Sequence, residues 1–346
     1  MLKNIILIVI SSFLFACVGR ENIVLNEDAK QFKTFQIEDS LVFTSLSDVF
    51  IDEPSEMLVY DNHLFIKTFG RAKEKHISVY SIEEDSIKAE YVGIGNGPDE
   101  MISCEMNRLD DELWLYDVSK MRVSKMKVDS SCSFSSPQME HYKLDRYYYR
   151  TAMLNDSIML GTNDYSDEKA MKISFVNLKT GEVLKRGQFS YINQSVDLPP
   201  LIDAYSCYVD VNPRTKDILL SYRYTDVIEI YDMYGGFKRS LHGPDCFNVE
   251  YQPLSDGKSM GKLPETRKAF VNSYVTADFI YLLYSGCKKT EENWSNGTQL
   301  LVYTWDGKPY KRYWLGESIY SFAVDELQRK IYSFSLNTET LIVANL

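Results

Sequence analysis

Short segments with apolar residues at every second position recur along the chain, and turn-forming residues separate them. This period is typical of half-buried β-strands. Two such strands can be aligned in each repeat. The first lies at 63–66, 112–116, 157–160, 217–220, 279–283 and 330–333, and the second at 77–80, 123–126, 173–176, 228–231, 300–303 and 341–343. Because both series have six members, the pattern predicts six copies of one sheet unit.

Glycine-rich stretches lie between some of these repeats. Residues 91–101 read Tyr-Val-Gly-Ile-Gly-Asn-Gly-Pro-Asp-Glu-Met, and residues 241–245 read Leu-His-Gly-Pro-Asp. The two Gly-Pro-Asp sites are 146 residues apart, which matches three propeller blades of about 49 residues each. Glycine leaves room where an outer strand ends and the chain crosses to the next sheet. The two stretches therefore predict joints between the blades of a β-propeller.

The chain ends predict how the ring closes. Residues 321–346 have room for about three strands, and the alternating segment Phe32–Ile37 precedes the first full blade. We expect this segment to join the last blade as its outer strand, because a closed ring leaves no unpaired sheet edge. The predicted fold is all-β, with residues 31–346 forming a single six-bladed β-propeller domain. Tight hairpin turns are expected at 178–182 and 305–308, and loops at the polar insertions 248–267 and 286–297.

The first residues have the layout of an export signal. Lys3 is followed by an apolar run over residues 5–15, interrupted by two serines. This run is shorter than the ~20 residues that span a bilayer. Leu14-Phe15-Ala16-Cys17 resembles the lipobox of bacterial lipoproteins. An ordinary secretory signal with a chance cysteine is the alternative.

The lipobox resemblance has consequences for the mature protein. It implies that residues 1–16 are a signal peptide that is removed, that Cys17 receives acyl chains such as palmitate, and that residues 17–30 form a tether. Several acyl chains hold a protein firmly at a membrane. Val18 stands where an aspartate is associated with inner-membrane retention, so the resemblance implies anchoring in the outer membrane, on a side that remains open.

Charge and motif content exclude several kinds of function. The formal net charge is −11, which disfavours nucleic-acid binding. No P-loop or Gly-x-Ser-x-Gly motif occurs, and no cofactor is expected. The four histidines lack metal-ligand spacing, so no metal site is expected, although His242 next to the second joint is a candidate contact. They are His63, His76, His141 and His242.

Five cysteines remain besides Cys17, and none forms a Cys-x-x-Cys pair. An odd number cannot all pair within one chain, so we expect buried free thiols. These residues are Cys104, Cys132, Cys207, Cys246 and Cys287.

Three features together resemble a known family. They are the lipobox, the joint Gly-x-Gly-x-Gly-Pro-Asp-Glu at 93–100, and the strand end Leu115-Tyr116-Asp117 followed by Arg122-Val123. The chain resembles the TolB-like six-bladed propeller lipoproteins of gut-type Gram-negative bacteria, which are related to NHL-repeat proteins. The resemblance implies the fold over the whole mature chain and implies no particular reaction.

The loops between blades and the loops between the two middle strands of a blade open on the same face of a propeller. In this sequence they carry a basic and aromatic set, namely Arg71, Arg122, Arg146, Tyr147, Tyr148, Tyr149, Arg150, Arg223 and Tyr224. Guanidinium groups bind carboxylates or phosphates, and rings stack on sugars or cations. The alternative is that 147–149 is an inner strand with rings in the core and that the arginines pair with acids.

The sequence thus predicts an outer-membrane-anchored propeller lipoprotein that acts as a ligand-binding or protein-interaction module, with a glycan, a peptide or an envelope protein as its partner. The predicted ligand contacts are Arg71, Arg122, Tyr149, Arg150, Arg223, Tyr224 and His242. The alternative function is a propeller hydrolase or lyase with an active site lining the channel. A deep pocket that brings ionisable groups from different blades within hydrogen-bond distance would favour the enzyme.

Overall fold

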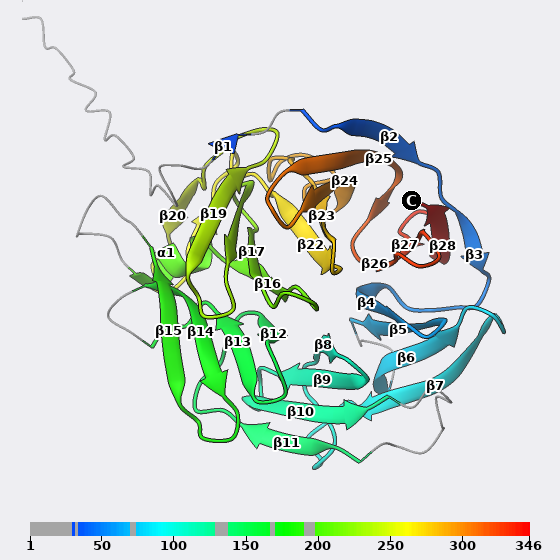
Figure 1. Cartoon of the computed structure of the whole chain (residues 1–346), viewed down its shortest axis with the longest axis horizontal. Coiled ribbons are helices and arrows are strands. Elements are labelled where there is room, and N and C mark those ends of the chain that lie inside the picture. Colours follow the sequence, from blue (N-terminus) through cyan, green and yellow to red (C-terminus); the bar gives the residue numbers. More distant parts are fainter. Residues whose placement is uncertain (1–29, 32–33, 70–73, 129–137, 167–169, 190–197) are drawn as a thin grey trace, which may run out of the picture.

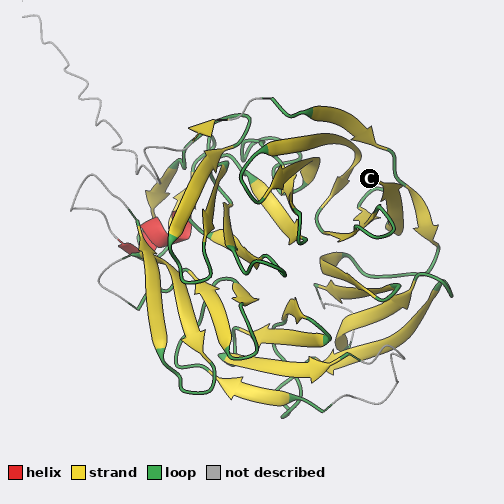
Figure 2. Ribbon diagram, in the orientation of Figure 1, coloured by secondary structure: helices red, strands yellow, loops and turns green. Residues whose placement is uncertain are grey.

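The computed structural model describes residues 30–31, 34–69, 74–128, 138–166, 170–189 and 198–346. Within them, six sheets, each built on four antiparallel strands, are arranged around one axis as the blades of a propeller (Figures 1 and 2). The predicted all-β six-bladed fold is confirmed. All twelve predicted strand segments fall in the second and third strands of the blades, counted from the axis.

Each blade has four strands that follow one another from the axis outward. Blades 1 to 3 contain β4 (Pro54–Tyr60), β5 (His63–Thr68), β6 (Lys75–Ser81) and β7 (Ser86–Gly93), then β8 (Glu105–Leu109), β9 (Glu112–Asp117), β10 (Arg122–Lys127) and β11 (Glu140–Lys143), then β12 (Thr151–Met153), β13 (Ile158–Thr162), β14 (Met171–Asn177) and β15 (Val183–Gln188). Blades 4 to 6 contain β16 (Cys207–Val211), β17 (Ile218–Tyr222), β18 (Val227–Tyr231) and β19 (Phe237–His242), then β22 (Phe270–Val275), β23 (Phe279–Tyr284), β24 (Gly297–Thr304) and β25 (Pro309–Ile319), then β26 (Phe322–Asp325), β27 (Lys330–Ser335), β28 (Thr340–Asn345) and β3 (Thr44–Ser47).

An N-terminal strand closes the ring, as predicted, but the segment differs from the one expected. The outer strand of blade 6 is β3, which pairs antiparallel with β28. Residues 32–33 lie outside the described residues, and Ile37 begins β2 (Ile37–Leu41), which pairs in parallel with β25 of blade 5. An alternating pattern marks a strand but does not encode which sheet edge it meets, so it could not separate the two segments. A further short strand, β1 (Lys30–Gln31), pairs with β19 of blade 4.

Both glycine-rich joints connect blades where the spacing predicted. The first lies between β7 and β8, and the second follows β19, before blade 5. Gly181 and Gly307 take φ values of +75° and +78° in their hairpin turns, a conformation that glycine adopts at little cost. Two features were not predicted. Insertion 248–267 contains a hairpin of β20 (Tyr251–Pro253) and β21 (Met260–Lys262), and α1 (Leu198–Ala204) precedes blade 4.

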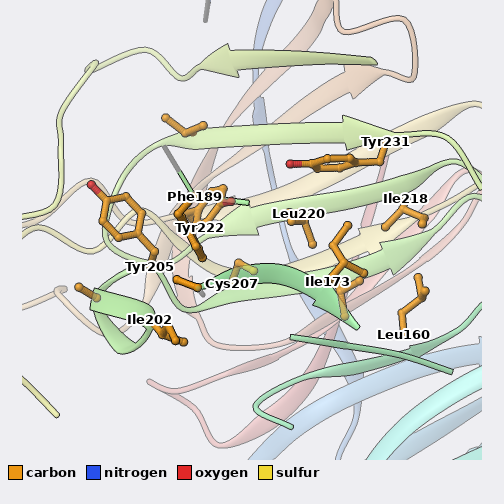
Figure 3. Packing of buried hydrophobic residues seen from close by; sticks show 14 of the residues in the cluster. Leu160, Ile173, Phe189, Ile202, Tyr205, Cys207, Ile218, Leu220, Tyr222 and Tyr231 are labelled. Atoms are coloured by element: carbon orange, nitrogen blue, oxygen red, sulfur yellow. The ribbon is translucent and has the colours of Figure 1, made fainter. Parts of the chain in front are cut away.

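The hydrophobic core lies between adjacent blades, since each sheet is covered on both faces. Figure 3 shows the interface of blades 3 and 4, where Leu160 and Ile173 pack with Leu220 and Tyr222. Cys207 is buried in the same cluster, and Cys104 is buried between blades 1 and 2. The prediction of buried thiols holds for these two.

The other cysteines differ from that prediction or fall outside it. Cys246 is exposed and Cys287 is half-buried, because both lie in surface loops rather than in strands. Cys132 lies outside the described residues.

Candidate functional site

The propeller is hollow along its axis. One hollow of about 940 Å³ follows the inner strands and reaches the face formed by the hairpins between first and second strands. A second, also about 940 Å³, opens on the face that carries the blade joints. Glu56, Glu105 and Arg150 line both hollows, so these three side chains lie where the two meet.

Arg150 and Arg223 lie on the ring of Tyr149. Their guanidinium carbons are 5.0 and 5.3 Å from the ring centroid, within the range of a cation–π interaction. Arg223 also donates a hydrogen bond from Nη1 to the Tyr149 hydroxyl. Tyr149 and Arg150 precede β12 of blade 3, whereas Arg223 follows β17 of blade 4. The fold thus brings three of the predicted residues together from two blades.

The cluster continues from Arg223 into two further cations. The guanidinium carbon of Arg223 lies 5.4 Å from the Tyr224 ring. The Nζ atoms of Lys262 and Lys268 lie 5.5 and 5.1 Å from the same ring. Both ammonium groups also lie 5.5 Å from the ring of Trp294, which stacks on Tyr224 with a centroid distance of 6.5 Å. We call Tyr149, Arg150, Arg223, Tyr224, Lys262, Lys268 and Trp294 the cationic cluster.

The four cations of this cluster have no ion pair with a carboxylate among the described residues. Lys268 is only 5% exposed. Burial lowers the pKa of Lys268 well below its ordinary value, and the charges of Arg223 and Lys262 lower it further. Burial, and then Arg223, also lower the pKa of Lys262. Burial and neighbouring positive charges therefore disfavour the charged form of Lys268, and no ion pair among the described residues offsets them.

Acidic groups lie deeper, where the two hollows meet. Burial raises the pKa of Glu105 to about 7, although the charge of Arg150 acts in the opposite direction. The Glu105 carboxylate accepts a hydrogen bond from the amide of Thr151 at 3.2 Å, and Glu56 accepts one from the amide of Met106 at 2.7 Å. Each carboxylate is thus held by the backbone of the next blade.

Arg122 and His242, two other predicted contacts, lie apart from the cationic cluster and support the blade joints. Arg122 donates from Nη1 to the carbonyl of Pro98 at 2.5 Å and from Nη2 to that of Glu100 at 2.7 Å. His242 Nδ1 lies 3.0 Å from the buried Asp226 carboxylate, which also accepts the amide of Cys246 at 2.7 Å. Arg71 lies outside the described residues.

The tyrosines at 147–149 divide between the two interpretations, ligand contact and core. Tyr148 is fully buried between blades 2 and 3, as the core interpretation predicts, while Tyr147 is exposed. Tyr149 is half-buried in the cationic cluster. Arg146 pairs with Asp145 at 2.7 Å, so for this arginine the pairing alternative holds.

Lys262, Lys268 and Trp294 were not among the predicted ligand contacts. They lie in or beside the two polar insertions, where the sequence carries no strand periodicity that would orient a side chain. An isolated tryptophan in a polar insertion was the available hint. Within the described part of the chain, no group of three His, Cys, Asp or Glu side chains could hold a metal ion, and no helix there is long and apolar enough to cross a membrane.

Comparisons with known proteins agree on the fold. The family model described as TolB-like 6-blade propeller-like matches residues 31–327. A Bacteroides fragilis structure whose name describes an exported protein aligns with a TM-score of 0.56 at 11% identity, over 89% of this chain and 98% of that one. A DUF4221 family member from Bacteroides vulgatus aligns with a TM-score of 0.54 at 11% identity, over 89% and 96%. The search among curated proteins found no match. At these identities the two structures support the fold alone.

Proposed function

The chain belongs to the TolB-like family of six-bladed propellers, and from this premise we propose that it is an exported binding module that holds its ligand on the blade-joint face. The observation that carries the proposal is the cationic cluster beside the open hollow of that face. Cations without acidic partners, stacked on aromatic rings, are suited to a glycan or peptide that brings its own negative charge. The rigid ring of blades holds these loops in position for binding.

Export and anchoring form the second part of the proposal. The layout of residues 1–16 supports export, and the similar Bacteroides fragilis protein is described as exported. The lipobox at Leu14–Cys17 supports a lipid anchor in the outer membrane. Labelled palmitate should be incorporated into the wild-type chain and not into Cys17→Ser, and the wild type should fractionate with outer membranes. Equal labelling of both chains would contradict the anchor.

An array of acidic and neutral glycans and of peptides tests the binding role. The wild-type domain should capture a subset of these ligands, and Arg223→Ala should reduce that capture. Arg214→Ala is a matched control, because Arg214 is an exposed arginine that pairs with Asp278 at 3.0 Å on the opposite, hairpin face. Absence of capture by the wild type, or equal capture by both variants, would contradict a binding site on the blade-joint face.

Glu105 supports the alternative of a hydrolase or lyase, because a carboxyl group with a pKa of about 7 in a hollow is suited to proton transfer. Among the described residues, however, no hydrogen bond joins carboxyl groups of two different blades, so the convergence that would favour the enzyme is not met. If an array ligand is cleaved, Glu105→Gln should abolish cleavage and retain capture. Unaltered ligand after prolonged incubation would leave the binding module as the function.

A further inference from the structure

Lys268 is an unusual residue in this protein. It is 5% exposed and has no carboxylate at ion-pair distance among the described residues. Its backbone is fixed, since its amide donates to the carbonyl of Cys287 at 2.9 Å and its own carbonyl accepts the amide of Gly286 at 2.9 Å. These two bonds place the Cα of Lys268 inside the loop pair, and the low exposure shows that its side chain lies within the protein. Burial of an ammonium group costs free energy unless a negative charge or hydrogen-bond acceptors replace the lost water.

The neighbours of Lys268 increase the need for a negative charge. Arg223, Lys262 and Arg150 all act on its ammonium group as like charges. Its Nζ atom lies 5.1 Å from the ring centroid of Tyr224 and 5.5 Å from that of Trp294. Aromatic faces attract a cation, but the attraction does not equal that of a buried carboxylate.

Two acids near the cluster act on other cations than Lys268. Asp203 acts on Lys262, but its Oδ2 accepts the amide of Met260 at 2.9 Å. Glu105 acts on Arg150 at the meeting point of the two hollows and accepts the amide of Thr151. Neither forms an ion pair with the lysines among the described residues.

We propose that Lys268, Lys262 and Arg223 form a subsite for an oxyanion, such as the carboxylate or sulfate group of a ligand. Arg223 and the lysines come from blade 4 and from the segment that leads into blade 5, so the subsite forms only in the folded ring. Tyr224 and Trp294 hold the ammonium groups in place through their stacked rings. We expect the preferred ligand to carry both an acidic group, which the cations bind, and a sugar or aromatic ring, which stacks on the aromatic side chains.

Binding of the oxyanion offsets the repulsion among the cations. In the empty site, burial and like charges disfavour the protonated lysine. A bound oxyanion restores a counter-charge beside the buried Lys268, where charge-assisted hydrogen bonds are strong, while the exposed Lys262 lies at the solvent side of the subsite. This inference rests on the proposed function for the biological ligand, but the subsite itself can be tested with simple ions.

Calorimetric titration of the folded domain with sulfate, glucuronate and glucose tests the subsite. We expect sulfate or glucuronate to bind and glucose, the uncharged control, to bind at least tenfold more weakly. Lys268→Met should weaken oxyanion binding by roughly 10- to 100-fold, and Lys268→Arg should retain most of it. Lys179→Met, which removes the same charge from an exposed turn of blade 3, should bind as the wild type does.

The outcomes separate the subsite from the proposed function. Equal oxyanion binding by the wild type and Lys268→Met, or no binding by the wild type, overturns the subsite. Binding of glucuronate alone assigns a carboxylate ligand, and binding of sulfate as well assigns a general oxyanion site.

If the array ligands are captured independently of Lys268, the proposed function stands and the subsite fails. If ions bind through Lys268 but no array ligand is captured, the subsite stands and the proposed function fails. Should Lys268→Met fail to fold, Lys268→Gln provides the same comparison.

Discussion

The Nζ atom of Lys172 lies 2.7 Å from Oε1 and 2.9 Å from Oε2 of Glu229, inside the interface between blades 3 and 4. The hydroxyls of Tyr222 and Tyr231 donate to the same carboxylate at 2.9 and 2.8 Å. Lys172 is 4% exposed, which is close to the 5% of Lys268. The protein therefore contains two similarly buried lysines. One is paired within the fold, and the other contacts two rings and has no ion pair among the described residues.

These two lysines predict opposite effects on stability. Lys172→Met leaves Glu229 buried without its cation and should lower the free energy of unfolding by about 3–5 kcal/mol. Lys268→Met removes an unpaired buried charge and should raise that free energy by about 1–3 kcal/mol. Urea unfolding monitored by tryptophan fluorescence measures both. A loss of stability in Lys268→Met would mean that the ammonium group is compensated within the fold.

Arg122 should act on stability rather than on ligand binding. It donates to the carbonyls of Pro98 and Glu100, and the joint is so tightly closed that a Cβ at Gly95 would lie 2.3 Å from a carboxylate oxygen of Glu100. Arg122→Ala should lower the free energy of unfolding by about 1–3 kcal/mol and leave ligand capture per folded molecule unchanged. Reduced capture with unchanged stability would show instead that Arg122 contacts the ligand.

The ionisation of Glu105 predicts a pH-dependent stability difference. Its pKa in the folded chain is about 7, raised from 4.5, so the stability contributed by the protonated group is fully present below about pH 4.5 and is lost as pH rises through about 7. The groups that act on it are Arg150, Glu56, Lys67 and the amide of Thr151. Glu105→Gln cannot ionise, so its stability relative to the wild type should increase between pH 5 and pH 8. Thermal melting at both pH values measures this, and a constant difference would contradict the raised pKa.

Residues before 34 should be dispensable for stability, whereas β3, which completes blade 6, should be required. A chain that begins at residue 34 keeps β2 and β3, together with the buried ring of Phe35 against Tyr303. It should melt close to a chain that begins at residue 17. A chain that begins at residue 48 loses β3 and exposes the edge of β28, so it should melt at a much lower temperature and associate. Circular dichroism and size-exclusion chromatography measure both effects. Similar melting of the two chains would show that closure by β3 contributes little.

The sequence predicts the repeated features of this fold better than the unique ones. The middle strands were located because short apolar or alternating segments recur between turn residues in every blade, and glycine spacing located the joints. The edge strand β2 was misassigned because its partner β25 comes from a distant part of the chain. The hairpin of β20 and β21 was missed because its strands of three residues each are too short to show a period. In the site, Tyr149, Arg150 and Arg223 were found by their position in loops of one face. Lys268 was missed because its burial depends on tertiary contacts with Tyr224 and Trp294.

The central claim is that the aromatic and cationic residues of the blade-joint face bind a ligand and are not merely part of the core. The most direct test compares array capture and melting temperature for the wild type, Arg150→Ala and Tyr149→Ala. Our account predicts capture reduced roughly 10-fold or more by either substitution, with a melting temperature close to that of the wild type. Undiminished capture, or a large fall in melting temperature that by itself explains the lost capture, would contradict it.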